Sequence, residues 1–557
     1  MKKQILSFVG GLFLILISSS VQAQDHGWHL LDADVNGSVG ISATSLYSNL
    51  LKGKSSQNVV VAVIDSGIDV EHEDLKDNIW VNPGEIPDNG IDDDNNGYVD
   101  DINGWNFIGG ADGSQVGPDT YEVTRLYGKY KYKYDTADRN KLAKDQKKEY
   151  DLYMRAKEEV ESKLAQAEAN FARYSDLKST FKMGLETLKD SLGGKAVTLD
   201  NVNAIDAGEN APLLESIAVV TRNLDSGAEI SDIDEFREEL LTDIQGGIDH
   251  FSNQMKYAYN PDFNTREIVG DDYSNQTEKY YGNNAVEGPD AFHGTHVAGI
   301  IGAMRGNDLG MDGVAANVSL MSVRTVPDGD ERDKDVANAI RYAVDNGASI
   351  INMSFGKGYS WNEKIVEDAI KYAEKKDVLL VHAAGNSSQD NDTTDNFPND
   401  IYKKKKFLGI FGGKEKTYKN WLEIGALNYE NGENLSAPFS NYGQKNVDLF
   451  APGMNIYSTT PDDNYRNAQG TSMAAPVVAG VAAVLRSYFP TLTAVQVKEI
   501  LMASSTKMNV EVLVPGSKED KKPFSELSVS GGVVNAEKAV KMAQTVKGKK
   551  KLSKGRA

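Results

Sequence analysis

The fold is decided by residues 59–67, which read Val59-Val60-Val61-Ala62-Val63-Ile64-Asp65-Ser66-Gly67. Six apolar residues run directly into an acid and a glycine. A continuous apolar run rich in β-branched residues is typical of a strand that is buried on both faces, as in a parallel sheet. Functional groups of such sheets gather at the C-terminal ends of the strands, and Asp65 falls at such an end.

The same kind of pattern returns after Ala291. Further buried strands are predicted at residues 320–326, 348–355, 378–384 and 422–427. Helical patterns accompany them at residues 297–304, 335–346 and 364–376. This β-α-β alternation predicts an α/β fold with a mostly parallel central sheet that is flanked by helices.

Residues 110–285 do not continue this alternation. Between Asp138 and Asp190 charge is dense, and apolar residues recur every seven positions at Tyr153, Val160, Ala167, Tyr174, Phe181 and Leu188. Such a pattern indicates a long amphipathic helix with a coiled-coil-like seam. We therefore predict an α-helical insertion domain at 110–285, which divides the α/β domain into residues 24–109 and 286–543.

The two ends of the chain differ from this core. Residues 1–23 are typical of a secretory signal peptide, with Lys2 and Lys3 ahead of an apolar run and an A-x-A-like site at its end. A membrane anchor is the alternative, but the run is short for a span. We expect an exported protein, periplasmic or extracellular, with no stable membrane span after signal removal. Residues 544–557 are strongly basic and are expected to form a disordered tail.

The composition limits the partners. The 557 residues carry a formal net charge of −21 and no cysteine. Such acidity argues against nucleic-acid binding. An exported chain without disulfides must gain its stability from packing or from bound ions.

A serine lies in the stretch Gly470-Thr471-Ser472-Met473-Ala474-Ala475-Pro476, ahead of an apolar run. Pro476 fits a first helical turn, so Ser472 is expected at a helix N-terminus. The positive end of a helix suits a nucleophile whose transition state develops negative charge. The alternative is a plain helix N-cap, a position that serine often takes.

Two other segments supply what a serine nucleophile needs. Its hydroxyl is weak unless a base removes the proton, and a histidine held by a carboxylate is such a base near neutral pH. His293 opens a helical stretch, and Asp65 ends a strand. Taken alone, Asp65 also fits a strand-end cap or a cation ligand. His293 and His296 also fit a metal pair on one helical turn, although a structural zinc site needs further Cys or His ligands.

A fourth segment, Ala383-Ala384-Gly385-Asn386-Ser387, follows a predicted strand. The side-chain amide of Asn386 can donate a hydrogen bond to an oxyanion. Taken alone, an asparagine at such a place is more often a turn residue.

Together these four segments resemble those of the subtilisin-like serine protease family, the subtilases, and the chain order Asp, His, Ser agrees with it. The resemblance implies Asp65 as the orienting acid, His293 as general base and then acid, and Ser472 as the nucleophile. It also implies Asn386 as an oxyanion-hole donor, together with the backbone N–H of Ser472. The expected activity is that of a serine endopeptidase that hydrolyses protein or peptide substrates through an acyl-enzyme intermediate, without an organic cofactor.

The resemblance covers about residues 28–109 and 286–543, and two other functions stay open beside it. One is a non-catalytic binding or scaffold protein on a subtilase fold, which uses the helical insertion for recognition. The other is a serine esterase, although Ser472 lacks the G-x-S-x-G elbow expected there. The complete set of catalytic residue types favours the protease.

The resemblance also implies where a substrate binds. Ser354, Phe355 and Gly356 line one side of the first specificity pocket, and Ala384 and Gly385 line the other. Small residues there leave room for a large apolar side chain. Residues 324–330 are expected to form a second backbone edge along the peptide. The alternative is ordinary sheet core.

An acidic loop at residues 92–101 alternates oxygen-bearing side chains and then turns at Gly97. This D-x-D-x-N-G pattern is typical of calcium loops, although position twelve is Asn103, where an EF-hand has a glutamate. The predicted ligands of a structural calcium ion are Asp92, Asp94, Asn96, Tyr98, Asp100 and Asp101. The alternative is a solvated acidic turn.

Two features depart from the simplest subtilases. Residues 24–57 are too few for the usual N-terminal pro-segment, so the control of folding and activity is an open question. The insertion lies between the Asp65 and His293 segments, where the family usually has a short connection. Because both its ends lead to these residues, we expect it at the active-site rim, where it gates substrate entry or recruits a partner.

Overall fold

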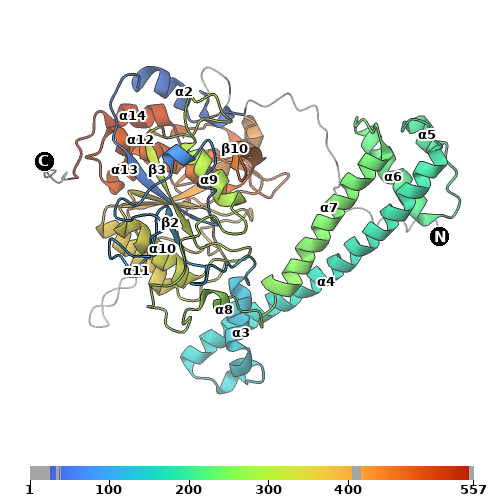
Figure 1. Ribbon diagram of the computed structural model, residues 1–557, viewed down its shortest axis with the longest axis horizontal. Helices are drawn as coiled ribbons and strands as arrows, with labels where there is room; N and C mark the ends of the chain where they lie inside the picture. Colours follow the sequence, from blue (N-terminus) through green and yellow to red (C-terminus); the bar gives the residue numbers. More distant parts are fainter. Residues whose placement is uncertain (1–25, 33–36, 38, 404–414, 551–557) are drawn as a thin grey trace. The chain divides into compact units, whose positions relative to one another are not determined.

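The computed structural model describes residues 26–32, 37, 39–403 and 415–550. The chain divides into two compact units (Figure 1): the smaller is Met154–Asn260, and the larger combines Asp25–Tyr153 with Pro261–Ala557. The smaller unit falls inside the segment where the sequence predicts an insertion, and the predicted signal peptide lies outside the described residues. Among the described helices, none combines the length and the apolar character that crossing a membrane requires.

The larger unit is built on a nine-stranded sheet in the order β12-β15-β9-β8-β5-β4-β1-β3-β2. Its strands are β1 Val59–Asp65, β2 Gly104–Asn106, β3 Val318–Arg324, β4 Ile350–Met353, β5 Leu379–Ala383, β8 Trp421–Leu427, β9 Leu449–Pro452, β12 Thr506–Lys507 and β15 Gly532–Val533. β12 pairs antiparallel with β15, and every other neighbour in this order pairs parallel. The mostly parallel sheet that the sequence predicts is confirmed.

Three two-stranded sheets accompany it in the described part of the chain. They pair β6 Ile401–Lys403 with β7 Glu415–Thr417, β10 Ile456–Thr460 with β11 Asn464–Ala468, and β13 Glu511–Leu513 with β14 Lys521–Pro523.

β1 is buried from both sides, as its unbroken apolar run predicts. Val61 and Val63 belong to one apolar core, and Ala62 and Ile64 to another, because alternate side chains of a strand point to opposite faces. The first core includes residues of helices α9 Phe292–Gly302, α12 Thr471–Tyr488, α13 Ala494–Ser504 and α14 Ala536–Ala543 (Figure 1). The second includes residues of α10 Asp333–Asp345 and α11 Glu363–Lys375.

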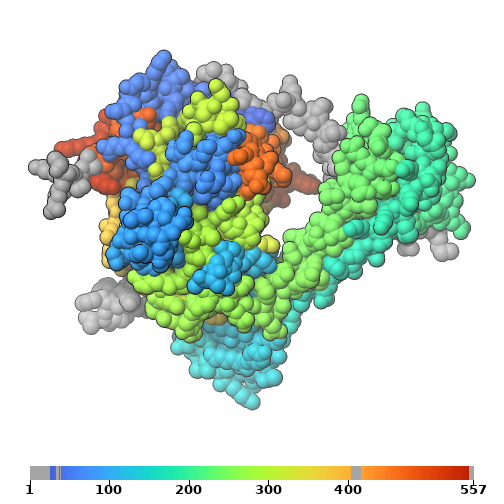
Figure 2. All heavy atoms as spheres, in the orientation of Figure 1, coloured from blue at the N-terminus to red at the C-terminus, as the bar shows by residue number. Residues whose placement is uncertain are grey.

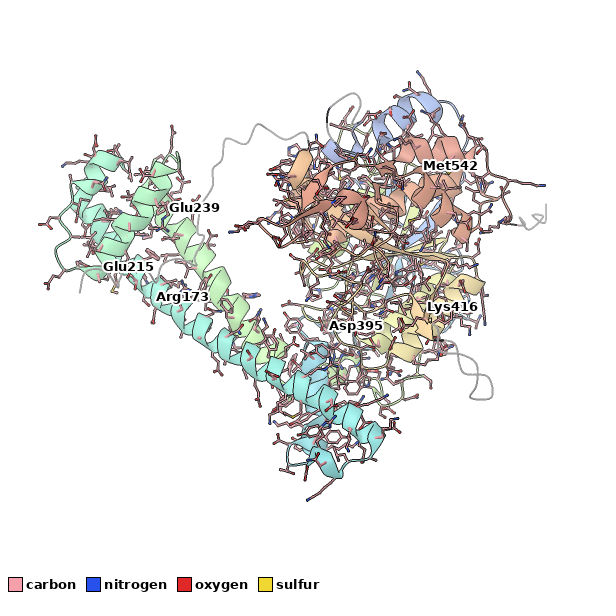
Figure 3. All side chains as sticks on the ribbon, turned by 180° about the vertical axis from the view of Figure 1, so that it is seen from behind. Arg173, Glu215, Glu239, Asp395, Lys416 and Met542 are labelled. Atoms are coloured by element: carbon pink, nitrogen blue, oxygen red, sulfur yellow. The ribbon has the colours of Figure 1, made fainter. Side chains whose placement is uncertain are left out.

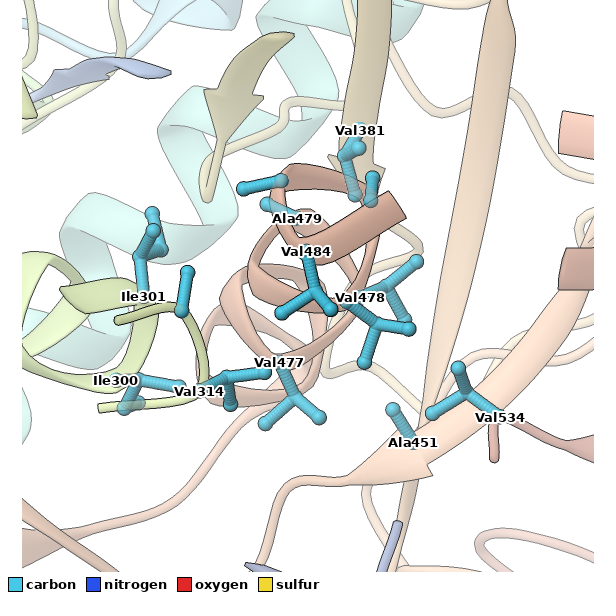
Figure 4. Packing of buried hydrophobic residues seen from close by; sticks show 14 of the residues in the cluster. Ile300, Ile301, Val314, Val381, Ala451, Val477, Val478, Ala479, Val484 and Val534 are labelled. Atoms are coloured by element: carbon cyan, nitrogen blue, oxygen red, sulfur yellow. The ribbon is translucent and has the colours of Figure 1, made fainter. Parts of the chain in front are cut away.

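Helix α12 lies at the centre of the first core (Figure 4). It contacts α9 and the strands β4, β5, β8 and β9, and its residues Val477, Val478 and Ala479 are fully buried. Gly480 permits the close approach, because a Cβ atom there would lie 2.5 Å from the Cβ atom of Val314. The small residues that follow Ser472 therefore allow α12 to pack closely against the sheet.

Both described ends of the chain pack on the larger unit. Short helical turns η1 Trp28–Leu30, α2 Ala43–Ser45 and η2 Leu46–Leu50 precede β1, and Trp28 and Leu46 are buried in the first core. At the other end, the Lys549 N–H donates to Gln496 Oε1 at 2.9 Å. The Lys550 N–H donates to the Thr491 carbonyl at 2.8 Å. The described part of the basic segment 544–557 is thus tied to the region around the start of α13.

The smaller unit is helical. It holds most of α4 Lys144–Leu192, together with α5 Leu199–Asn203, α6 Ala211–Asp225, α7 Ile233–Asn253 and η5 Gln254–Ala258. Four residues of the predicted seam are buried: Val160, Ala167, Phe181 and Leu188. Phe181 and Leu188 share an apolar core with residues of α6 and α7. The helices α6 and α7 are green in Figure 2. The exposed faces carry charged side chains such as Arg173, Glu215 and Glu239 (Figure 3).

The first and last parts of the predicted insertion belong to the larger unit. They contain α3 Glu122–Tyr134, η4 Arg139–Lys141 and α8 Arg266–Val269. The remaining described turns are η3 Lys76–Asn78, η6 Gly432–Asn434 and η7 Phe524–Glu526.

Candidate active site

Asp65 and His293 meet at the C-terminal end of β1. The carboxylate can only accept, so His293 Nδ1 donates to Asp65 Oδ1, at 2.6 Å. The same oxygen accepts the Ser66 N–H at 2.8 Å. The Asp65 side chain is 2% exposed and the His293 side chain 38%. One face of the imidazole ring therefore stays open while a buried carboxylate fixes its orientation.

Two glycines permit this approach. Gly67, just past β1, has a φ of 127°, and a Cβ atom there would lie 1.9 Å from the Glu287 carbonyl oxygen. Gly294, in the first turn of α9, would place a Cβ atom 2.0 Å from the Gly67 carbonyl oxygen. The C-terminal end of β1 and the N-terminal end of α9 are thus in direct backbone contact. That contact brings His293 within reach of Asp65.

The surroundings of His293 shift its pKa. Burial lowers the pKa. The negative charge of Asp65, the hydrogen bond to it and the charge of Asp290 together raise the pKa by more than burial lowers it. The net result is a pKa above the usual 6.5. His293 is thereby a stronger base than a free imidazole.

Ser472 stands in the first turn of α12, as the sequence predicts. Gly470, the residue before Thr471, has a φ of 152°, a conformation that suits glycine. The Ser472 hydroxyl donates to the Ser354 carbonyl at 3.0 Å, and the Ser354 hydroxyl donates to the Ser472 carbonyl at 2.8 Å. In this conformation the hydroxyl is directed to the end of β4. Among the described residues, its hydrogen-bond partner is Ser354 and not His293.

Asn386 follows β5 and is oriented by Thr471. Its Oδ1 accepts the Thr471 N–H at 2.8 Å and the Thr471 hydroxyl at 3.0 Å, while the Thr471 hydroxyl accepts the Gly385 N–H at 3.1 Å. The amide oxygen is thereby occupied, and Nδ2 is left to donate. A Cβ atom on Gly470 would lie 3.3 Å from Asn386 Nδ2 and 3.5 Å from the Ser472 nitrogen. Two N–H donors therefore border one space that the glycine leaves open.

The segments predicted to line a substrate pocket follow β4 and β5. Ser354 and Ala384 are buried, and the ring of Phe355, 9% exposed, packs edge-on against His382. A Cβ atom on Gly356 would lie 2.6 Å from Asn396 Oδ1. Gly356 and Asn396 are therefore in close contact, and Phe355 has its ring turned to the core.

The sequence did not predict the role of three side chains that shape this site. Thr471 orients Asn386. Asn396 and Asn441 each donate from Nδ2 to the Ala384 carbonyl, at 3.1 and 2.9 Å. Thr471 had a signal, because it adjoins Ser472. The two asparagines lie in segments without a helical or strand pattern, and only the fold shows that they meet Ala384.

His296 has a structural role. It is fully buried, and its Nε2 lies 3.0 Å from the Arg466 carbonyl oxygen. Burial lowers its pKa to about 4, so it stays neutral at physiological pH. Within the described residues, the one group of His, Cys, Asp or Glu that is suited to a metal ion does not include His293 or His296.

That group lies in the acidic loop. Carboxylate oxygens of Glu85, Asp92 and Asp94 lie within 4.8 Å of one another. The Asn96 and Gly97 N–H groups hold Asp92, at 3.0 and 2.8 Å. Glu85 lies outside the predicted ligand set because it precedes the 92–101 pattern. Three carboxylates this close repel one another, and a hard cation with oxygen ligands is the group that they fit.

Of the other predicted ligands, Asn96 lies beside Asp94, because its Nδ2 donates to Asp94 Oδ2 at 3.2 Å, whereas Asp100 and Asp101 make other contacts. Asp100 accepts the Asn89 and Gly90 N–H groups, at 3.2 and 2.8 Å. Asp101 is buried and accepts the Tyr342 hydroxyl at 2.6 Å. The backbone N–H of Tyr98 donates to Asn96 Oδ1 at 2.8 Å. The structure brings Asp92 and Asp94 together and uses the rest to hold the loop.

Comparison with known proteins gives consistent matches. The sequence model of the Subtilase family matches residues 56–525. Subtilisin-like protease 1 of Plasmodium vivax is 30% identical over 309 residues, which are 52% of this chain and 48% of that protein. Subtilisin DY of Bacillus licheniformis is 34% identical over 218 residues, which are 39% of this chain and 71% of that protein.

A solved protease structure from Pseudoalteromonas arctica is 28% identical, with a TM-score of 0.36, and the match covers 45% of this chain and 70% of that one. The match spans about half the length of the Plasmodium subtilisin-like protease 1 sequences and a fifth of Plasmodium falciparum subtilisin-like protease 2.

Replacing Asp65 by asparagine is expected to lower the pKa of His293, because it removes the charge that stabilises the imidazolium. The wild-type pKa should lie above 6.5. Histidine-selective NMR titration measures both values. Asp290→Asn is the control and should lower the pKa less, since Asp290 forms no hydrogen bond to the ring. An unchanged His293 pKa in Asp65→Asn would contradict the assigned contact.

Proposed function

The chain belongs to the subtilase family, and from that premise we propose that it is an exported serine endopeptidase. The observation that carries the proposal is the 2.6 Å hydrogen bond between His293 Nδ1 and Asp65 Oδ1. Among the described residues, Nε2 of this basic imidazole has no hydrogen-bond partner, at the sheet edge where β4 and β5 also end. Ser354, which accepts the hydrogen bond of Ser472, directly follows β4, and Asn386 follows β5.

The reaction begins at the Ser472 hydroxyl. In our proposal, rotation about the Ser472 side chain takes the hydroxyl from the Ser354 carbonyl to His293 Nε2, which removes its proton as Oγ attacks the substrate carbonyl. His293 then returns that proton to the leaving amine, and the acyl-enzyme forms. Water attacks the acyl group in the same way, with His293 again as base and then acid.

Negative charge develops on the carbonyl oxygen during each attack. The Asn386 side chain and the Ser472 N–H are the donors that we assign to it, because both border the space beside Gly470. Thr471 keeps the Asn386 amide turned so that Nδ2 is the free end. Donors fixed in advance need no reorganisation when the charge appears. Asp65 holds the imidazole in the required tautomer and stabilises the imidazolium.

The substrates in this proposal are proteins or peptides. We assign one wall of the peptide cleft to Ser354–Gly356 and the second backbone edge to residues 324–330, with Ala384 and Gly385 facing the first wall. Export to the periplasm or beyond is part of the proposal. It is supported by the signal-like residues 1–23.

A calcium ion is the second part of the proposal. Glu85, Asp92 and Asp94 would hold it, because their oxygen atoms converge and carry excess negative charge. When bound, such an ion supplies no step of the reaction and acts as a cross-link of the acidic loop. In a chain without cysteine it takes the place of a disulfide.

A fluorophosphonate probe is expected to label the wild-type protein and not Ser472→Ala, because the probe reacts with an activated serine. Ser387→Ala is the control, since Ser387 is exposed on the turn that follows Asn386. Mass spectrometry of the labelled peptide locates the modified serine. Labelling that survives Ser472→Ala would remove the proposed nucleophile.

Asn386→Leu is expected to lower kcat by about 10²–10³, the usual effect of losing one oxyanion donor. KM should change little, because the donor acts chiefly in the transition state. Peptide hydrolysis kinetics measure both constants, with Asn431→Leu as the control, because Asn431 is exposed and its Nδ2 donates to the Gly37 carbonyl. A change in KM without a change in kcat would assign Asn386 to substrate binding instead.

Removing calcium with EDTA is expected to lower the melting temperature. An ion present at about 100 times its Kd stabilises the fold by about 2.7 kcal/mol. In Glu85→Gln the difference between calcium and EDTA should shrink or vanish, whereas Asp112→Asn, an exposed acid elsewhere, should keep it. Equal melting temperatures of the wild type in both buffers would refute the calcium site.

A further inference from the structure

The predicted insertion leaves the α/β unit through residues 117–125, here called the outgoing limb, and re-enters it through residues 265–281, the return limb. Both limbs belong to the larger unit. The outgoing limb pairs with the segment after β3: the Asp119 N–H donates to the Asp328 carbonyl, and the Asp328 N–H donates to the Gly117 carbonyl, each at 2.9 Å. A Cβ atom on Gly329 would lie 2.4 Å from the Asp119 carbonyl oxygen, so the two backbones are in direct contact.

Arg125, in the first turns of α3, holds the same segment. Its Nη1 and Nη2 atoms donate to the Asp330 carbonyl, both at 3.1 Å, and Nη2 also donates to the Glu331 carbonyl at 3.1 Å. Its Nε donates to Glu122 at 2.5 Å. The Arg125 side chain is 5% exposed. A buried guanidinium from the insertion therefore fixes the backbone next to the proposed second edge of the cleft.

Glu122 reaches the other wall through Lys357. This lysine follows Ser354–Gly356 directly, and its Nζ lies 3.6 Å from Glu122 Oε1 and 2.7 Å from Asp333 Oδ1. Nζ also donates to the Glu331 carbonyl at 2.6 Å. The side chain of Lys357 is 1% exposed. Glu122, from the insertion, thus contacts Lys357, the residue that links the wall after β4 to the segment after β3.

These contacts belong to one cluster, here called the root cluster, which is buried apart from the partly exposed Asp330. It consists of Asp119, Glu122, Arg125, Asp330, Glu331, Arg332, Asp333 and Lys357. Asp119 pairs with Arg332 through two hydrogen bonds, at 2.8 and 2.9 Å. Removing one partner from such a group leaves a buried charge uncompensated. The limb and the two walls are therefore held in one arrangement.

The return limb is anchored chiefly to other residues, and it meets the root cluster where Arg332 Nη2 donates to Thr265 Oγ1 at 3.3 Å. Arg266 is also 5% exposed, and it pairs with Asp271 at 2.5 Å and with Asp335 at 2.7 Å. Asp335 lies in the first turn of α10, beyond both wall segments. Arg266 therefore fastens the insertion to the larger unit as firmly as Arg125 does, but it makes no hydrogen bond to residues 328–331 or to Lys357.

We propose that the outgoing limb is a clamp on the peptide cleft, in which Arg125 and Glu122 are positioning residues that fix the spacing of its two walls. The inference rests on the proposed function, which assigns these walls to peptide binding. It makes the insertion a built-in determinant of how an extended substrate is held, separate from the chemistry at Ser472.

The test compares an extended peptide substrate with a single-residue ester. Arg125→Lys keeps the charge but loses the planar fork, and Glu122→Gln loses the charge but keeps an acceptor. For each we expect KM for the extended peptide to rise about tenfold, the effect of one charge-assisted hydrogen bond. KM for the ester, kcat per active site and the fluorophosphonate labelling rate should stay within about twofold. Fluorophosphonate titration gives the concentration of active sites.

Arg266→Lys is the matched control, because it weakens an equally buried ion pair of the insertion. It should lower the melting temperature as Arg125→Lys does and leave both KM values unchanged. The clamp is refuted if Arg125→Lys and Arg266→Lys raise the peptide KM equally, or if peptide and ester are affected alike. If Arg125→Lys does not fold, Glu122→Gln decides by the same criteria. Failure of the proposed function is distinguishable, since wild-type Ser472 would then not be labelled.

Discussion

The burial of β1 from both faces is the constraint on which the rest of the structure depends. A strand with apolar side chains on both faces leaves polar chemistry only at its ends, because an unpaired polar group in either core is costly. Asp65 stands at that end and meets His293 at 2.6 Å. The neighbouring strands β3, β4 and β5 run parallel to β1 and end at the same edge. This edge is therefore where the wall segments and Asn386 collect.

Room for groups to approach is the second requirement, and glycine provides it at three points. Gly67 and Gly294 let the end of β1 touch the start of α9, so that a carboxylate and an imidazole from distant parts of the chain share a hydrogen bond. Gly470 leaves open the space between two N–H donors. A side chain at Gly67 or Gly294 would collide with a backbone oxygen atom, and a Cβ atom on Gly470 would occupy part of the space between the two donors. The orientation of each polar group then follows from one neighbour: Ser66 for Asp65 and Thr471 for Asn386.

The sequence predicted what has a local signal. The apolar run of residues 59–64 predicts β1 and its parallel neighbours, and the seven-residue pattern predicts the buried face of α4. Glu85 and Asn441 have no such signal. Each matters because folding brings it to a distant segment, and no spacing in the chain records that meeting. The ion pair of Glu122 with Lys357 is the same case: Glu122 lies in a stretch with no α/β pattern, and charge alone does not reveal burial.

The root cluster shows why buried charges can hold geometry even where they add little stability. It contains five carboxyl groups and three cations. Burial raises the pKa of Glu331 to about 8, which favours its neutral form at neutral pH, and it also raises the pKa of Asp330. Asp119 pairs with Arg332, Glu122 with Arg125, and Asp333 with Lys357. Exchanging such a paired set for apolar residues is often harmless, whereas displacing one member leaves a charge unpaired in the interior. The cluster therefore resists any movement of the outgoing limb that does not also move the two walls.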